Sequence, residues 1–216
     1  MTDAGIAPRI IVCEADVAEG AAWLAGAEPR FAEVLALTGP LPLRRRPGGF
    51  DGLLRAIVSQ QLSVAAAAAV WARLEATGAT APGGLAAADD DALRACGLSR
   101  QKIAYARALA AEGLDFEALA ALPPDAAIAR MTAVKGVGVW TAEIYLMFAV
   151  GHADVFAPGD LALQEAARAL FALPERPREK ALRTMAEAWT PWRGVAARLL
   201  WAYYGHLKSR EGVVEV

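Results

Sequence analysis

Apolar residues recur every three or four positions along most of the chain, which is the spacing of amphipathic helices. Proline and glycine interrupt this pattern repeatedly and leave segments of ordinary helical length between them. Strand patterns are scarce, since the β-branched runs, Ile10 to Val12 and Val213 to Val214, lie near the two ends. An all-α globule without a fixed repeat period is therefore predicted. Its helices are expected at 18–26, 30–38, 50–60, 63–77, 90–96, 100–112, 124–132, 138–150, 160–172, 177–189 and 192–207.

The composition agrees with a globular protein. The chain has 216 residues, of which 56% are hydrophobic and 52 are alanine, so a disordered chain is excluded. The longest uncharged run, 56–72, contains polar serine and glutamine residues and is a poor membrane span. The first residues do not have the basic-then-apolar pattern of a signal peptide. We therefore expect a cytoplasmic protein without a membrane partner.

Metal-ligating residues are few. The two cysteines, Cys13 and Cys96, lie far apart, and the two histidines are His152 and His206. These residues do not form a zinc site at known ligand spacings, and four-cysteine iron–sulfur ligation is impossible. No cofactor is expected to be required.

The charge of the whole chain does not suggest a nucleic-acid partner, because the net charge is −2. Basic residues nevertheless outnumber acidic ones in residues 161–210, and Arg44 to Arg46 form a second basic cluster. Both regions are candidates for phosphate contacts. Charge alone favours the simpler interpretation, which is that they are solvated helix faces.

A short glycine-rich hairpin is the most unusual motif. Residues 131–142 read Met-Thr-Ala-Val-Lys-Gly-Val-Gly-Val-Trp-Thr-Ala. One helix is predicted to end near Thr132 and the next to begin near Gly138. Glycine permits backbone angles and close approaches that other residues do not, and N–H groups at a helix start favour an anion such as phosphate. Val134 and Val137 are expected to anchor the hairpin, although a plain helix–helix turn would explain the glycines as well.

Asp160 is the second candidate for chemistry. It follows Pro158 and Gly159 and precedes a helical pattern, which predicts a helix N-cap. A purely structural cap is common. However, the helix dipole also favours a negative charge at this position, and a fixed anion is suited to stabilising a positive, oxocarbenium-like sugar.

Four motifs in order resemble the helix-hairpin-helix (HhH-GPD) DNA glycosylases, and most closely their DNA-3-methyladenine glycosylase II (alkylpurine) branch. They are Ser59-Gln60-Gln61-Leu62-Ser63, Lys135 to Ala142, Asp154 to Asp160, and Pro191-Trp192-Arg193. The resemblance runs from about Phe50 to Tyr204. It implies two helical lobes, a central one over 50–155 with the helix-hairpin-helix at about 124–150, and a second made of 1–49 and 156–216. It also implies a short form without the β-containing N-terminal domain of longer members.

The resemblance implies a role for each motif. Asp160 matches the catalytic aspartate, which stabilises the oxocarbenium ion and orients or deprotonates the attacking water. Gln61 matches the side chain that fills the gap left by the extruded nucleotide, and Trp140 and Trp192 match aromatic positions of the base pocket. The other implied DNA contacts are Gln60, Leu62, Lys135, Gly136, Val137, Gly138, Thr141 and Arg193. The implied sodium or potassium site consists of the carbonyl groups of Thr132, Val134 and Val137.

The implied activity is removal of alkylated purines from damaged duplex DNA by a monomeric, nucleoid-associated enzyme. Trp140 stands where bifunctional members carry a lysine nucleophile, so no lyase activity is expected. Ile144 and Leu161 replace pocket tyrosines of better-known members, and Trp201 is expected to be core packing. Arg193 is expected to contact phosphate or to pair with a neighbour such as Glu187. The alternatives are a glycosylase for deaminated or oxidised bases and a DNA-binding module without chemistry.

Overall fold

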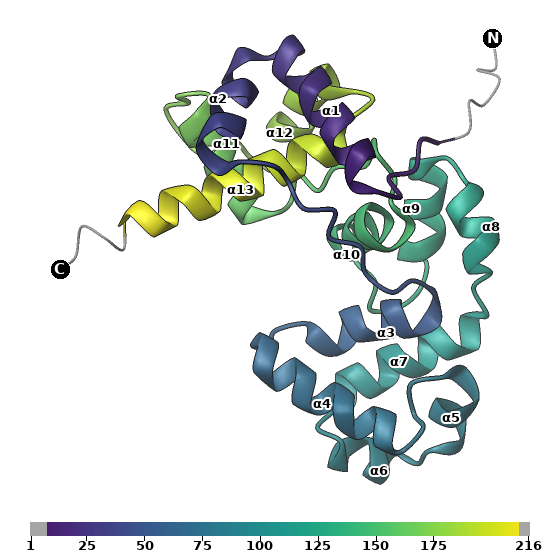
Figure 1. Ribbon diagram of the computed structural model, residues 1–216. Coiled ribbons are helices and arrows are strands. Elements are labelled where there is room, and N and C mark those ends of the chain that lie inside the picture. The colour runs from purple at the N-terminus through teal and green to yellow at the C-terminus, as the bar shows by residue number, and fades with distance from the viewer. Residues whose placement is uncertain (1–7, 212–216) are drawn as a thin grey trace. The chain divides into compact units, whose positions relative to one another are not determined.

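The computed structural model describes residues 8–211, and within them thirteen α-helices, one π-helix and one 3₁₀-helix account for the regular structure (Figure 1). The predicted all-α class is confirmed, because the described residues contain only an isolated bridge between Ile10 and His152 and no β-strand. Val213 and Val214 lie outside the described residues. Among the described helices, none combines the length and the apolar character that crossing a bilayer requires.

The chain forms two compact units, which are described separately below. The continuous unit is Arg46–Tyr145, and the discontinuous unit contains the residues up to Arg45 and those from Leu146 onward. The second boundary thus lies after Tyr145 rather than near residue 155. The residues that follow Tyr145 pack inside the discontinuous unit, where the Phe148 ring lies 5.6 Å from the Trp201 ring.

The continuous unit is built around α7 (Arg100–Glu112), which packs against α3 (Gly49–Ser59) and two short helices. Helix α3 also packs against α4 and α10, and its start is fixed because the Gly49 N–H donates to the Tyr145 hydroxyl at 2.8 Å. The remaining helices of this unit are α4 (Val64–Ala76), α5 (Pro82–Ala87), α6 (Asp90–Ala95), α8 (Phe116–Ala121), α9 (Pro124–Thr132) and α10 (Val139–Tyr145).

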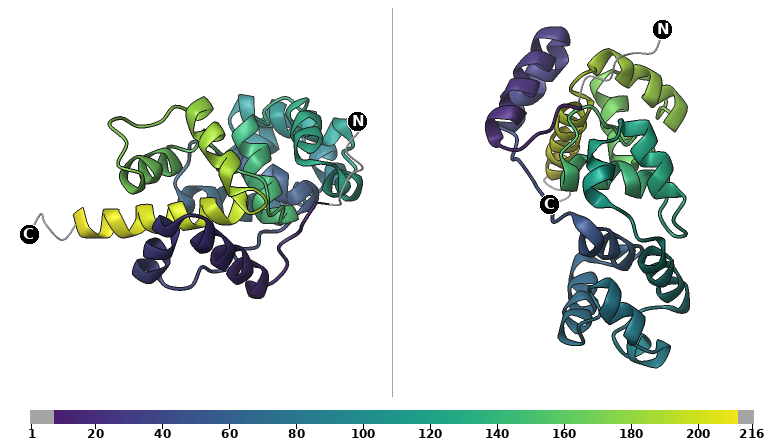
Figure 2. Two further views of the ribbon diagram at one scale, coloured as in Figure 1. Left: turned by 90° about the horizontal axis from the view of Figure 1, so that it is seen from above. Right: turned by 90° about the vertical axis from the view of Figure 1, so that its right-hand side faces the viewer.

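The discontinuous unit is built around α13 (Arg193–Glu211), with α1 and α2 on one side of it and α11 and α12 on the other (Figure 2). Its core is aromatic, since Phe31, Phe156 and Phe171 surround Trp189 with ring centroids 5.4–5.8 Å away. Its other elements are α1 (Glu14–Ala27), α2 (Pro29–Thr38), the π-helix η1 (Leu146–Val150), α11 (Leu161–Leu170), α12 (Glu179–Ala186) and the 3₁₀-helix η2 (Glu187–Trp189).

The helix expected over 138–150 is not a single α-helix, because it changes to the π-helix η1 at Leu146. The Leu146 carbonyl accepts hydrogen bonds from the N–H groups of Gly151 and His152, at 2.8 and 2.9 Å. These donors lie five and six residues further along the chain, whereas an α-helical carbonyl bonds the N–H group four residues further along. Arginine side chains bond the carbonyls of this segment, since Arg45 Nη1 donates to Val150 O at 2.8 Å and Arg198 Nη2 to Met147 O at 3.3 Å.

Arg198 is buried, with 4% of its surface exposed, and its Nε has no hydrogen-bond partner among the described residues. Its guanidinium also donates to Gly194 O at 2.9 Å and lies over the Phe148 ring at 4.8 Å. Burial, together with the positive charges of Arg44 and Arg45, lowers the pKa of Arg198 to about 10, so it remains charged at neutral pH.

The sequence pattern does not predict two short helices. Helix α5 begins at Pro82, where the sequence predicts a break, and α8 spans Phe116–Ala121. Proline suits the first turn of a helix because its φ is already helical and its missing N–H would be unbonded there. Helix α8 begins because the Asp115 carboxylate accepts the N–H groups of Glu117 and Ala118. One turn and a half of helix is too short to show a periodic pattern.

Candidate functional site

Asp160 is the N-cap of α11, as its sequence context predicts. Its Oδ1 atom accepts the N–H groups of Ala162 and Leu163 at 2.9 and 3.1 Å, and its own N–H donates to Ala157 O at 3.0 Å. The side chain is half-buried. The first turn of α11 therefore holds the carboxylate in one direction, where the helix dipole favours its negative charge.

Trp201 is the residue that sequence reasoning missed. Its Nε1 donates to Asp160 Oδ1 at 3.2 Å, from a position on α13 that was expected to be core packing. The Phe148 ring lies 5.6 Å from the indole at an interplanar angle of 35°. Leu161, the next residue after Asp160, is 61% exposed. The carboxylate thus has an indole donor on one side and a large exposed aliphatic side chain next to it in the chain.

Trp192 does not have the open surface that a base-stacking residue needs. It is 2% exposed, and a Cβ on Gly20 would lie only 2.5 Å from its ring. The Arg9 guanidinium lies over the ring at 4.2 Å from its centroid. The indole is therefore part of the packing between α1 and the start of α13, and the structure offers no face of it to a ligand.

Arg193 pairs with a carboxylate, as one of the two expectations has it, but the partner is Asp154. Its Nε and Nη2 atoms donate to the two carboxylate oxygens of Asp154 at 2.8 and 2.9 Å, and its backbone N–H donates to Oδ1 at 3.3 Å. The backbone N–H of Gly194 donates to Ala153 O at 2.7 Å. These bonds tie the start of α13 to the loop that leads to Asp160, so the Arg193 guanidinium is already engaged by a carboxylate.

Other arginines of the basic segment 161–210 are also paired with carboxylates. Arg168 and Arg176 both bond Glu165, and Arg183 bonds Glu179. These exposed pairs agree with the simpler interpretation of solvated helix faces. Arg45 Nη1 donates hydrogen bonds to Ile11 O and Val150 O, at 2.9 and 2.8 Å.

The glycine hairpin joins α9 to α10, as predicted. Val134 and Val137 are 2% and 4% exposed and anchor it in the continuous unit, and the Val137 N–H donates to Val134 O at 3.0 Å. Gly136 has φ +95°, and a Cβ there would lie 2.2 Å from Tyr105 Cγ. At Gly138 a Cβ would have no atom within 4 Å. Gly136 is therefore required by the fold, whereas Gly138 leaves open space above the start of α10.

The residues after the hairpin separate into exposed and buried positions. Val139 and Trp140 are 45% and 46% exposed, so Trp140 presents its indole to the outside of the continuous unit. Thr141 is 6% exposed and Ile144 is 8% exposed. Thr141 is therefore almost wholly buried, and its side chain does not present the surface that the DNA contact implied by the resemblance requires. Lys135 is exposed.

Ser59 to Leu62 form a tight turn after α3. Gln60 has φ −54° and ψ 130°, Gln61 has φ +57°, and the Leu62 N–H donates to Ser59 O at 3.2 Å, which is the geometry of a type II turn. Gln61 is exposed and Leu62 is 39% exposed. The Gln60 side chain is partly buried, and its Nε2 donates to Gly136 O at 3.2 Å. The structure thus brings Gln60 to the hairpin and leaves Gln61 and Leu62 at the surface.

Within residues 8–211, histidine, cysteine and carboxylate side chains do not gather in groups of three or more that could hold a metal ion. The hairpin carbonyls are a different class of ligand, since main-chain oxygens suit hard cations. The Val134 carbonyl accepts one hydrogen bond, from Val137, and a carbonyl oxygen has two lone pairs. The donor set is therefore chemically compatible with Na⁺ or K⁺.

Comparison with known proteins relates the chain to one family. Residues 54–193 match the HhH-GPD superfamily of base excision DNA repair proteins. The chain is similar to the crystal structure of a DNA-3-methyladenine glycosidase from Bacillus halodurans, with 33% identity, 92% of each chain covered and a TM-score of 0.80. A structure of 3-methyladenine DNA glycosylase from Schizosaccharomyces pombe in complex with abasic DNA has 28% identity, covers 85% of this chain and 95% of that chain, and has a TM-score of 0.74. DNA-3-methyladenine glycosylase 1 of Schizosaccharomyces pombe is 29% identical over 190 residues, which are 82% of this chain and 83% of that protein.

The two hairpin glycines are expected to respond differently to the same small change. Gly136→Ala introduces a Cβ into the Tyr105 ring at a left-handed φ, so it should lower the free energy of unfolding by about 2 kcal/mol or more. Gly138→Ala is the matched control and should change it by less than about 0.5 kcal/mol, because the added methyl meets open space. Urea denaturation of both variants measures the difference. Equal stabilities would contradict the packing described for Gly136.

Proposed function

The chain belongs to the HhH-GPD superfamily of base excision DNA repair proteins, and we propose that it is a DNA-3-methyladenine glycosylase. Its reaction is hydrolysis of the N-glycosidic bond of alkylated purines, of the 3-methyladenine and 7-methylguanine type, in duplex DNA. The observation that carries this proposal is the fixed carboxylate of Asp160, which lies inside the matched segment and accepts two backbone N–H groups and the Trp201 indole. The similarity to 3-methyladenine glycosylases of two organisms supports the substrate class.

The proposed chemistry needs an anion more than an acid. When the bond between C1′ and the purine nitrogen breaks, its electron pair goes to the purine, and the deoxyribose becomes an oxocarbenium ion. A purine alkylated at N3 or N7 is already cationic, so it leaves as a neutral base without prior protonation. Asp160 offsets the positive charge on the sugar and orients the water that attacks C1′, and that water loses its proton to the carboxylate or to solvent. The products are the free alkylated base and an abasic site.

Recognition is proposed to depend on the continuous unit. The target nucleotide must leave the base stack before its glycosidic bond can be reached, and a damaged base does so at lower cost. Gln61, exposed at its turn, fills the gap, and the hairpin from Lys135 to Gly138 holds the DNA backbone. The exposed indole of Trp140 attracts a cationic base by about 0.5–2 kcal/mol. Trp192 receives no stacking role because it is buried.

The proposal also includes a bound ion, the oligomeric state and the location of the protein. The carbonyls of Thr132, Val134 and Val137 would hold a Na⁺ or K⁺ ion, which supplies positive charge next to a DNA phosphate. No other cofactor is proposed. We expect the protein to act as a monomer on damaged duplex DNA in the cytoplasm.

Methylated duplex DNA provides the direct test of the substrate class. The purified protein should release 3-methyladenine and 7-methylguanine into solution, because both are cationic purines with labile glycosidic bonds. Mass spectrometry of the freed bases identifies them, and single-lesion duplexes carrying uracil, hypoxanthine or 8-oxoguanine serve as comparisons. Release of a deaminated or oxidised base without any alkylpurine would contradict the proposal.

Asp160→Asn tests the role of the carboxylate. Asparagine keeps the oxygen that caps α11 but removes the negative charge, so base release should fall at least about 100-fold while binding to damaged duplex is kept. Asp115→Asn makes the same chemical change at the N-cap of α8 and should release bases at the wild-type rate. Single-turnover kinetics and a binding assay separate the two effects. Undiminished base release by Asp160→Asn would mean that the catalytic role is wrongly assigned.

Borohydride trapping tests whether the reaction is hydrolysis alone. A lyase forms a Schiff base between an amine and C1′, and borohydride reduces it to a stable protein–DNA adduct. Since Trp140 stands at the position of the lysine nucleophile, no adduct should form under conditions in which a bifunctional glycosylase/lyase is trapped. A trapped adduct that depends on the lesion would restore lyase chemistry.

A further inference from the structure

The turn that carries Gln61 is bonded to the hairpin through its neighbour. Gln60 Nε2 donates to Gly136 O at 3.2 Å, across 76 positions of the sequence, and the Gln60 side chain is partly buried. The family resemblance implies that Gln60 lies beside Gln61 as a DNA contact. In the structure its amide instead points at the backbone of the other DNA-binding element.

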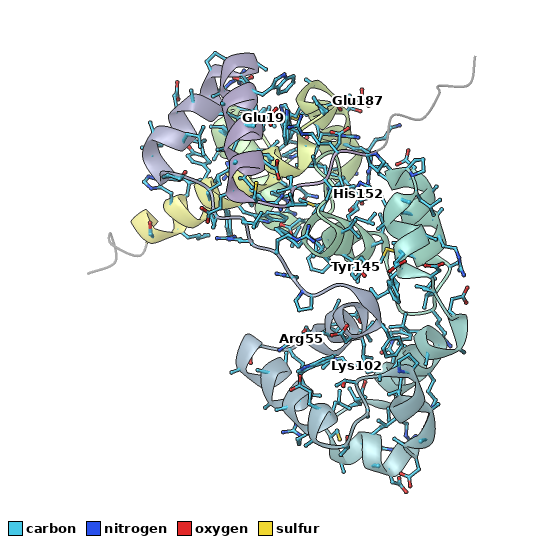
Figure 3. The ribbon with its side chains drawn as sticks, turned by 45° about the vertical axis from the view of Figure 1, so that its right-hand side comes forward. Glu19, Arg55, Lys102, Tyr145, His152 and Glu187 are labelled. Carbon is cyan, nitrogen blue, oxygen red and sulfur yellow. The ribbon has the colours of Figure 1, made fainter. Side chains whose placement is uncertain are left out.

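Helix α7 contacts both elements. Lys102 Nζ donates to Val58 O at 2.7 Å, and Val58 is in the last turn of α3, whose carbonyls lack helical partners (Figure 3). Tyr105 lies three residues further along, on the same face of α7. Gly136 is seated directly against its side chain, since a Cβ there would be 2.2 Å from Tyr105 Cγ. One face of one helix therefore contacts the end of α3 and the tip of the hairpin.

The turn itself is under strain. Gln61 has φ +57°, a left-handed conformation that glycine or asparagine usually provides at this position of a type II turn. Non-glycine residues in such conformations persist where the surroundings hold them, and they concentrate at functional sites. The Gln60 and Lys102 hydrogen bonds lie on either side of Ser59 and hold the turn in this conformation.

We propose that Gln60, Lys102 and Tyr105 form a positioning clamp, which fixes the separation between the Gln61 side chain and the phosphate-binding hairpin. Gln60 is in this case a positioning residue that acts through Gln61, and it is not a DNA contact. The inference rests on the proposed function, because a fixed separation matters only when one element grips the DNA backbone and the other enters the stack. Nucleotides follow one another every ~3.4 Å along a DNA strand, and misplacement of a reacting group by about 1 Å can cost two orders of magnitude in rate.

A double-mutant cycle between adjacent glutamines tests the clamp. Gln60→Ala should lower the single-turnover rate of 7-methylguanine release about 10-fold in the wild-type background. In the Gln61→Ala background the same change should cost less than about 2-fold, because the side chain to be positioned is gone. The affinity of Gln60→Ala for undamaged duplex, and its salt dependence, should remain within about 2-fold of the wild type.

A second readout follows nucleotide extrusion without chemistry. In duplexes carrying 2-aminopurine next to an abasic-site analogue, Gln60→Ala should reduce the fluorescence change that reports unstacking, as Gln61→Ala does. Lys102→Met keeps the aliphatic stem but loses the bond to Val58 O, so it should reproduce this defect. Arg100→Met removes the same charge from an exposed position on α7 and should have a smaller effect than Lys102→Met.

Two results would overturn the clamp. The first is a double variant whose loss of rate equals the product of the losses in Gln60→Ala and Gln61→Ala, because the two residues would then act independently. A loss of undamaged-duplex affinity of about 10-fold in Gln60→Ala, with a flatter salt dependence, would make Gln60 a direct DNA contact. If Gln60→Ala does not fold, Lys102→Met in both backgrounds decides between the same outcomes. A wild-type protein that extrudes the nucleotide yet releases no alkylpurine would contradict the proposed function and leave the clamp intact.

Discussion

Three N–H donors converge on one oxygen atom of Asp160, two from the first turn of α11 and one from the Trp201 indole. This arrangement fixes the direction of the carboxylate, and under the proposed function the carboxylate needs no reorganisation when positive charge develops nearby. The loop leading to Asp160 is fixed as well, because the Asp154 carboxylate accepts hydrogen bonds from both the side chain and the backbone N–H of Arg193 at the start of α13. The carboxylate therefore belongs to a rigid framework rather than to a mobile loop.

In the continuous unit, by contrast, glycine residues allow the backbone to come close to other groups. Gly136 lies against Tyr105, and Gly138 leaves the start of α10 uncovered. The buried side chains of Val134 and Val137 anchor the hairpin. Under the proposed function, the discontinuous unit therefore supplies the carboxylate of Asp160, and the continuous unit supplies the exposed elements that bind DNA.

Local rules explain what could be predicted from the sequence. The Asp160 cap, the glycine hairpin and its buried valines each follow from neighbouring residues, and the structure contains them. Contacts between distant segments could not be predicted in this way. Trp192 directly precedes α13 and Trp201 lies in the middle of that helix, and only the packing of α1 and α11 determines that the first is buried and the second reaches Asp160. The Gln60 bond to Gly136 and the Asp154 partner of Arg193 depend on tertiary placement in the same sense.

The buried guanidinium of Arg198 is linked to Asp160 through a short series of contacts. It lies over Phe148, Phe148 lies against Trp201, and Trp201 bonds Asp160. Its guanidinium also donates hydrogen bonds to Met147 O and Gly194 O. The single ammonium group of lysine cannot reproduce this pair of bonds. A substitution deep in this core can therefore change the position of the Trp201 indole next to Asp160 as well as the packing of the interior.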